Sequence, residues 1–405
     1  MYAFRKPYTV DSYADLQLWG VGYKVMLIFF QVGGYASAKL LGVKYVSEMP
    51  YGRRTRTILA LIAAAHFTLL LYAVAPLWLK PACLFCDGLA LGMVFGCVFG
   101  YLEGRRSTEL MAAGLCASFI MASGTVKTAG AVLMRDFAVP LFWMPFATGA
   151  LFWTPLLLGA WMLAQIPRPT AADVQSRAPR EPIDGHDRMR FFRRYRFGIC
   201  LLVAMVMLLT VVRSFRDDYA KEIWAGLGFD RPEIFAETET LVAILSLGLS
   251  GLAVLMRSNH RAFQVSMLIA GVGFTAALAT TACSWSPTAW SERGAFWFMV
   301  LIGVGFYVPY ILFHTTIFER LLATLRDKGN VGYLMYLSDF AGYATTVLLL
   351  LIMQVVSEQS VDFVQVLLWL TVLASPLCLL CTVLVMVYFG RRLRAVAHNA
   401  HRHTT

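Results

Sequence analysis

The sequence has few charged residues: Asp, Glu, Lys and Arg make up only 15% of its 405 positions. Hydrophobic residues make up 59%, and the mean hydropathy is +0.64, which excludes an ordinary soluble domain. The longest polar stretch between apolar segments is about thirty residues, too short for an extramembrane domain. The strand-like alternation of a membrane β-barrel is also missing. These absences leave a chain of apolar helices in a bilayer.

Motifs for ATP-driven or enzymatic chemistry are missing as well. The sequence has no glycine-rich loop to cradle nucleotide phosphates, which argues against ATP-driven transport. No nucleophile–base pair stands out in any predicted loop, so we do not expect an enzyme. Two Cys-x-x-Cys pairs, Cys83 with Cys86 and Cys378 with Cys381, lack partners at zinc-binding spacing. We therefore predict no metal site and no cofactor.

Eleven apolar stretches are long enough to cross a bilayer, which requires roughly 20 helical residues each. This pattern predicts an all-α polytopic membrane protein. The predicted spans are residues 20–41, 57–79, 82–101, 108–130, 140–165, 197–214, 238–256, 262–283, 295–318, 330–354 and 363–389.

The basic residues between the predicted spans lie mostly on one side of the membrane. If the spans alternate, 23 of the 35 Lys and Arg residues share a side with residues 42–56, whereas 8 lie opposite and four lie within spans. The positive-inside rule makes the richer side cytoplasmic, which predicts a multi-pass protein of the bacterial inner membrane with a cytoplasmic C-terminus. The net charge of +11 then reflects topology, and we expect no nucleic-acid partner.

The order of the spans predicts two halves. Residues 1–8 look like the outer end of a helix, so we expect a twelfth span to precede Tyr2; a short segment on the outer surface is the alternative. A Pro- and Arg-rich stretch after the fifth span reads as a cytoplasmic linker. Six-plus-six spans around such a linker is the layout of major facilitator transporters. The predicted units are an N-terminal six-helix bundle (1–166), the linker (167–196), a C-terminal six-helix bundle (197–391) and a tail (392–405).

Charges inside the spans are the best indicators of function, because a charge in hydrocarbon needs a partner or water. Asp339 lies far from either end of its span, and Lys127 lies among small residues that suit a helix lining a cavity. A snorkelling side chain is the alternative for the basic residues near span ends, which are Arg5, Lys6, Lys24, Lys39 and Arg213. The charges in or beside spans are Arg5, Lys6, Lys24, Lys39, Lys127 and Arg213 against Asp87 and Asp339. This positive excess predicts a cavity that attracts an anion, and arginine matches phosphate or carboxylate with two hydrogen bonds.

Short motifs around these residues resemble those of the organophosphate:phosphate antiporters. Tyr2-Ala-Phe-Arg5-Lys6 is similar to the Arg-Lys end of their first helix, and Leu209-Thr-Val-Val-Arg213 to the segment holding their seventh-helix Arg. Tyr35-Ala-Ser-Ala-Lys39-Leu-Leu-Gly42 is similar to their second-helix pattern. The resemblance implies that Arg5 and Arg213 grip a substrate phosphate, with Lys6 and Lys39 along the route.

Other segments depart from that family. Ser123-Gly-Thr-Val-Lys127 holds a lysine where the family tends to carry a histidine. Gly34-Tyr35 and Gly100-Tyr-Leu-Glu-Gly-Arg-Arg106 look more like an uncharacterised bacterial branch of the major facilitators, which supplies no substrate. A degenerate form of the facilitator loop motif also follows the second helix. Its expected role is a cytoplasmic gating latch formed by Glu48, Arg53 and Arg54 with Glu103, Arg105 and Arg106; a solvated charged loop is an equally good reading.

We therefore predict a monomeric secondary transporter that moves a small anionic, phosphorylated solute across the lipid bilayer by alternating access, as an antiporter would. Substrate binding is expected at Arg5, Lys6, Lys39, Lys127 and Arg213, and ion pairing or proton coupling at Asp339. The alternatives are a non-transporting receptor for an anionic solute and a facilitator-type exporter of another substrate.

Overall fold

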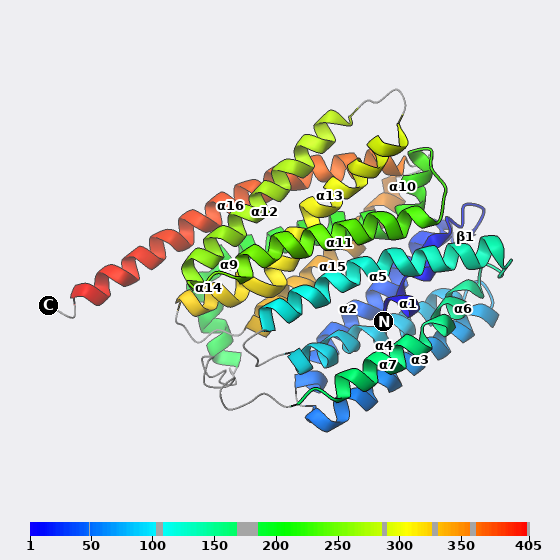
Figure 1. Ribbon diagram of the computed structural model, residues 1–405, viewed down its shortest axis with the longest axis horizontal. Helices are drawn as coiled ribbons and strands as arrows, with labels where there is room; N and C mark the ends of the chain where they lie inside the picture. The colour runs from blue at the N-terminus through cyan, green and yellow to red at the C-terminus, as the bar shows by residue number, and fades with distance from the viewer. Residues whose placement is uncertain are drawn as a thin grey trace.

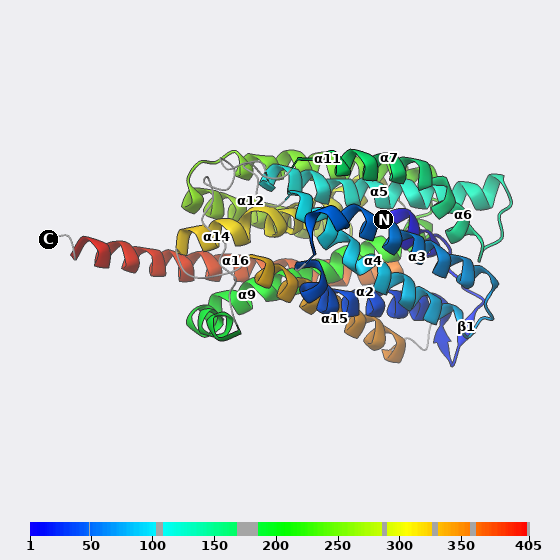
Figure 2. The same ribbon diagram turned by 90° about the horizontal axis from the view of Figure 1, so that it is seen from below.

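The computed structural model describes residues 1–47, 49–102, 108–167, 185–285, 290–325, 331–356 and 362–402. Within these ranges the chain is helical almost throughout, and most helices follow the long axis of the molecule (Figures 1 and 2). The strands in this part of the chain are β1 (Gln17–Leu18) and β2 (Val21–Gly22), which form one antiparallel hairpin. The predicted all-α class is confirmed, apart from this hairpin.

We call the helices before residue 167 the N-terminal helices and those after residue 184 the C-terminal helices. The N-terminal helices are α1 (Tyr2–Arg5), η1 (Pro7–Val10), α2 (Tyr23–Ser47), η2 (Tyr51–Arg53), α3 (Arg54–Val74), α4 (Lys80–Leu102), α5 (Thr108–Asp136), α6 (Met144–Leu151) and α7 (Trp153–Ala164). The C-terminal helices are α9 (Gly185–Asp218), α10 (Ala220–Gly226), α11 (Glu233–Val254), α12 (Asn259–Cys283), α13 (Glu292–Leu312), the π-helical turn η3 (Phe313–Ile317), α14 (Phe318–Leu325), α15 (Val331–Val356) and α16 (Phe363–Arg402).

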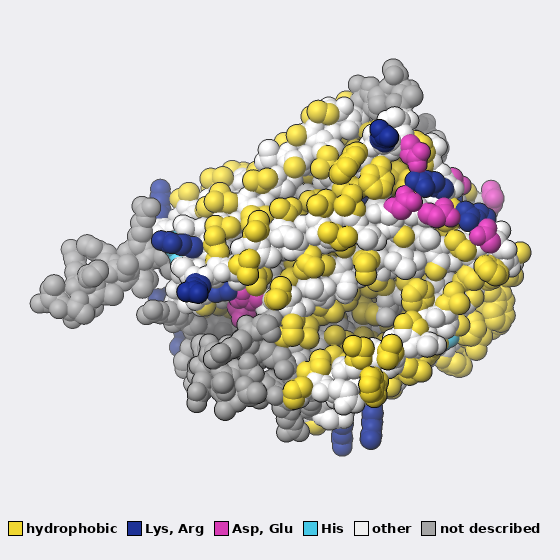
Figure 3. All heavy atoms as spheres, viewed as in Figure 1, with side chains coloured by type: hydrophobic (Ala, Val, Ile, Leu, Met, Phe, Trp, Pro, Cys, Tyr) yellow, Lys and Arg dark blue, Asp and Glu magenta, His cyan; other side chains and the backbone are white. Residues whose placement is uncertain are grey.

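The helices fit a membrane. In the described chain, nine are long and apolar enough to cross one, and the pair α6–α7, bent by 45°, provides a tenth if it counts as one span. The remaining predicted span coincides with α2, a helix of 25 residues. Apolar side chains cover much of the flank in Figure 3, whereas charged side chains gather toward its two ends. The chain is therefore a multi-pass membrane protein.

Several predicted boundaries differ from the structure, among them three in the C-terminal half of the chain. Residues 185–196, assigned to the linker, belong to α9, which bends at Tyr195. The same helix continues beyond the predicted end of its span at residue 214, to Asp218. Residues 392–402, assigned to the tail, continue α16, which projects beyond the other helices in Figure 1.

The N-terminal helices enclose the start of the chain. α1 packs against α3, α4, α5 and α6, and all four of its residues are buried. Across the middle of the molecule, α5 packs on α11 and α2 packs on α15. The segment Tyr2–Arg5 therefore lies in the interior, close to the boundary between the two sets of helices.

Glycines allow α2 and α4 to pack backbone against backbone. A Cβ atom added at Gly34 would lie 2.0 Å from the carbonyl oxygen of Phe85, and one at Gly88 would lie 2.1 Å from the carbonyl oxygen of Gln31. Small residues give membrane helices this close approach. The position of Lys39 and Tyr35, further along α2, depends on this contact.

We expect Gly34→Ala to destabilise the protein by about 1–3 kcal/mol, because the added methyl group must push two backbones apart. The neighbouring Gly33→Ala is a matched control, since its Cβ would lie 4.0 Å from the Phe85 ring, an ordinary contact distance. Thermal unfolding of both variants in detergent measures the difference. Equal melting temperatures for the two variants would contradict the close contact.

Candidate functional site

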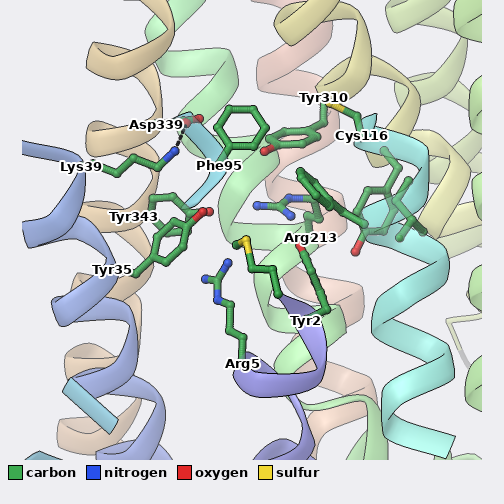
Figure 4. Close-up of a pocket in the computed structure, with 14 residues that line it drawn as sticks. Tyr2, Arg5, Tyr35, Lys39, Phe95, Cys116, Arg213, Tyr310, Asp339 and Tyr343 are labelled. Atoms are coloured by element: carbon green, nitrogen blue, oxygen red, sulfur yellow. Dashed lines mark hydrogen bonds and ion pairs between the residues drawn. The ribbon is translucent and has the colours of Figure 1, made fainter. Parts of the chain in front are cut away.

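A small cavity lies between the N-terminal and C-terminal helices. Its lining includes Arg5 from α1, Lys39 from α2, Arg213 from α9 and Asp339 from α15, with five tyrosines among the other residues (Figure 4). The centre of a water molecule can occupy only about 20 Å³ of it, which is room for one or two waters. The remaining lining residues are Met1, Tyr2, Tyr35, Phe95, Cys116, Phe119, Ile120, Tyr307, Tyr310 and Tyr343.

The two arginines of the cavity are held by aromatic rings. Arg5 Cζ lies 3.9 Å from the ring centroid of Tyr35, and Arg213 Cζ lies 4.2 Å from that of Tyr310. The two arginines are 6% and 8% exposed, and Figure 4 shows both guanidinium groups directed into the cavity. Cation–π contacts of this kind stabilise a charge while leaving its N–H donors free.

Neither arginine is neutralised by a carboxylate. No ion pair joins Arg5 or Arg213 to an acidic residue among the described residues, and the Nε atom of each has no hydrogen-bond partner there. A buried guanidinium without a counter-charge is costly, and such groups in membrane proteins mark binding sites or ion pathways. The arrangement is therefore suited to an anion that enters the cavity.

Lys39 and Asp339 both line the cavity and contact each other. Lys39 Nζ lies 3.3 Å from Asp339 Oδ2, and His314 Nε2 lies 2.9 Å from Asp339 Oδ1. Lys39 thus lines the cavity with its charge compensated in part. His314 received no role in the sequence analysis.

The structure does not bring Lys6 and Lys127 to the cavity lining. Lys6 Nζ lies 2.5 Å from both Asp217 Oδ2 and Asp218 Oδ1, and Lys127 Nζ lies 2.5 Å from Asp217 Oδ1. Ser123 Oγ donates to the same carboxylate at 2.6 Å. Each lysine therefore has an acidic partner, and the expected positive excess is confined to Arg5 and Arg213.

Sequence reasoning missed the acidic partners because it placed Asp217, Asp218 and Glu222 in a loop and gave no role to Glu239, at the start of the predicted span 238–256. Asp217 and Asp218 end α9, Glu222 in α10 pairs with Lys24 at 2.6 Å, and Glu239 in α11 pairs with Arg216 at 2.7 Å. No glycine or proline interrupts the chain between Arg213 and Asp218, so helix-stop signals could have placed them inside the helix. Asp87 on α4 is buried as well, but it does not line the cavity.

The expected gating latch lies only partly within the described residues. Glu48, Glu103, Arg105 and Arg106 fall outside them. Arg53 is exposed beside the start of α3, and the Arg54 guanidinium donates to the carbonyl oxygen of Gly100 on α4. The Arg54 side chain therefore links the start of α3 to α4 through a hydrogen bond.

Comparisons with known proteins identify the fold and the family of this chain. A crystal structure of a D-xylose–proton symporter is similar over 95% of this chain and 94% of that chain, with a TM-score of 0.58 at 11% sequence identity, which identifies the major facilitator fold. Comparison with curated proteins finds no match. The model of a family of unknown function, DUF5690, matches residues 7–392. The chain therefore belongs to the DUF5690 family, and its fold is that of the major facilitators.

Proposed function

We propose that this protein is a secondary transporter that moves a small anionic solute, with a phosphorylated compound as the first candidate, across the bacterial inner membrane. The observation that carries the proposal is the pair Arg5 and Arg213, both buried, both without an acidic partner in the described chain, and both directed into one cavity. Two like charges in one poorly hydrated cavity repel each other. An anion between them removes that repulsion and accepts hydrogen bonds from both guanidinium groups.

The ion pairs between the two sets of helices support alternating access. Toward the end of the molecule that carries α10 and β1, Lys24 pairs with Glu222, and Lys6 pairs with Asp217 and Asp218. Toward the end that carries α14, Glu109 pairs with Arg320 at 2.7 Å. Separating the pairs at one end, while those at the other end stay closed, opens the cavity to one side of the membrane. The basic loops predicted at the α14 end make that side cytoplasmic.

The short motifs that resemble organophosphate:phosphate antiporters favour exchange of a phosphorylated compound for inorganic phosphate. The tyrosines support a phosphate or carboxylate ligand, since their hydroxyl groups can donate hydrogen bonds to its oxygens. A receptor that binds the same anion without moving it is the second candidate, because it would need the same cavity. Measured flux separates the two.

A thermal-shift panel on the purified protein tests the proposal. It compares inorganic phosphate, glycerol-3-phosphate, sugar phosphates, carboxylates and neutral analogues, because a ligand of the folded state stabilises it by about 2.7 kcal/mol at 100 times its Kd. We expect stabilisation by a phosphorylated compound, and counterflow of that compound in vesicles containing the protein. Binding without counterflow favours the receptor. A shift with neutral compounds alone would overturn the anion site.

A further inference from the structure

The imidazole ring of His314 lies between two hydrogen-bond acceptors. Its Nδ1 atom lies 2.9 Å from the carbonyl oxygen of Tyr310, and its Nε2 atom lies 2.9 Å from Asp339 Oδ1. A neutral imidazole has one N–H and can donate to only one of them, whereas an imidazolium donates to both. The side chain is 2% exposed, so solvent does not compete for either nitrogen. The geometry therefore fits a doubly protonated ring beside an ionised Asp339.

His66 provides an internal comparison. The indole nitrogen of Trp153 donates to Nδ1 of His66, and Nε2 of His66 lies 3.1 Å from the carbonyl oxygen of Phe146. One ring nitrogen accepts and the other donates, which a neutral imidazole satisfies completely. Of these two histidines, only His314 has an acceptor beside each ring nitrogen and therefore needs a second ring proton.

His314 is connected to the anion site through its two neighbours. The Tyr310 ring lies 4.2 Å from the His314 ring on one side, and Arg213 Cζ lies 4.2 Å from the same tyrosine ring. The other neighbour, Asp339, also binds Lys39 and lines the cavity. An anion that attracts Arg213 therefore acts on the Tyr310 ring beside the imidazole. An anion that attracts Lys39 acts on Asp339, the acceptor of the imidazole.

The backbone around His314 can change its geometry. His314 lies in the π-helical turn η3, and Pro309 in the preceding α13 cannot donate a backbone hydrogen bond. Single π-helical turns interrupt regular helices and occur frequently at functional sites. Loss of the second ring proton would leave one nitrogen facing an acceptor without a hydrogen, and the ring would turn away from Asp339 or from the Tyr310 carbonyl.

The charges around this pair favour a bound anion. With His314 and Lys39 protonated and Asp339 ionised, the three groups carry one net positive charge, which adds to Arg5 and Arg213. Of the helices packed on η3, α11 holds Glu239, bound to Arg216, and α14 holds Arg320, bound to Glu109. The other titratable groups on the packed elements are Cys116, Lys127, Arg135 and Asp136 of α5, Glu233 and Glu237 of α11, His260, Arg261 and Cys283 near the ends of α12, Glu292, Arg293 and Tyr307 of α13, and Glu319 of α14.

We propose that the His314–Asp339 pair is a proton-binding site, and that the anion and this proton bind together. The inference rests on the proposed function, since it couples the proton to the same cavity. An anion in the cavity stabilises the imidazolium, and by thermodynamic reciprocity the imidazolium raises the affinity for the anion by the same factor. The proton comes from solvent, resides on the imidazole while the anion is bound, and returns to solvent when the anion leaves.

Calorimetric titration with inorganic phosphate, in buffers of different protonation enthalpy, counts the protons taken up per bound anion. At a pH at which His314 of the unliganded protein is neutral, we expect the wild-type protein to take up about one proton more than His314→Gln. Its phosphate affinity should fall by up to about tenfold per pH unit over the pH range in which that proton is taken up. His66→Gln is the matched control and should behave as wild type. Equal proton uptake in wild type and His314→Gln would overturn the proposal.

A second measurement does not depend on phosphate binding or on the folding of one variant. Nitrogen-15 histidine spectra of the bilayer-reconstituted protein, recorded over a range of pH, should show one ring that becomes protonated on both nitrogens as the pH falls. This ring should keep one unprotonated nitrogen in Asp339→Asn at the same pH. The His66 ring should keep one unprotonated nitrogen. If phosphate does not bind, the anion function fails, and the spectra alone decide the proton site: an imidazolium that forms as the pH falls supports it, and a His314 ring that stays neutral at every pH tested overturns it.

Discussion

Replacing both cavity arginines, Arg5→Ala with Arg213→Ala, is expected to lower the affinity for the anion by at least about 100-fold. A hydrogen bond to a charged group contributes about 1.5–3 kcal/mol, and two such groups act on one ligand. Each single substitution should lower affinity by about 10–100-fold. The melting temperature without ligand should stay the same or rise, because the substitutions remove buried charges that have no partner. Calorimetry and thermal unfolding of the same preparations measure both effects.

Arg135→Ala is the control for charge removal. Arg135 lies at the end of α5, 49% exposed, where it pairs with Asp136 and Glu233. Its loss should leave anion affinity unchanged, since the side chain lies outside the cavity lining. Wild-type affinity in the double arginine variant would mean that Arg5 and Arg213 serve only to pack against Tyr35 and Tyr310.

Asp217→Ala is expected to destabilise the protein by about 3–5 kcal/mol. Removing one partner of a buried ion pair leaves an uncompensated charge, and here one carboxylate serves both Lys6 and Lys127. Asp218 can still compensate Lys6, so Lys127 should account for most of the loss. The free energy of unfolding in detergent, from denaturant or heat, is the quantity to compare.

A solvent-exposed pair and a double variant complete this test. Asp230 pairs with Lys221 but is 71% exposed, so Asp230→Ala should change stability by less than about 1 kcal/mol. Lys127→Met combined with Asp217→Asn removes both charges and should recover most of the stability lost in Asp217→Ala. If Asp217→Ala unfolds with the same free energy as Asp230→Ala, the buried network does not contribute as described.

The sequence predicted the helices well because long apolar runs leave few alternatives in a bilayer. Their ends were less certain, since hydropathy falls at the first charges even when a helix continues. At α9 the apolar run stops near residue 214, yet the helix extends to Asp218 because Lys6 and Lys127 compensate the carboxylates. Lys6 and Asp218 are 212 residues apart along the chain, and Lys127 and Asp217 are 90 residues apart. A local sequence pattern cannot show that such distant residues pair.

The candidate site was predictable only in part. Arg5 and Arg213 drew attention as charges in or beside apolar segments, and the structure places both at one cavity. Lys6 and Lys127 have the same sequence character, but tertiary contacts with Asp217 separate them from it. For His314, a single histidine after a proline gives no sign that both ring nitrogens meet acceptors, because one acceptor comes from α15.

The division of charge between the two sets of helices has a consequence for assembly. Near α10 the N-terminal helices and the residue after α1 contribute the lysines, Lys6, Lys24 and Lys127, whereas the C-terminal helices contribute the carboxylates of Asp217, Asp218 and Glu222. Two copies of the N-terminal helices would bring lysine against lysine at this surface, and two copies of the C-terminal helices would bring carboxylate against carboxylate. Like charges at a contact penalise the wrong partner more than opposite charges strengthen the right one. During folding in the membrane, this surface therefore favours contact between the N-terminal and the C-terminal helices. It disfavours contact between two copies of the same set of helices.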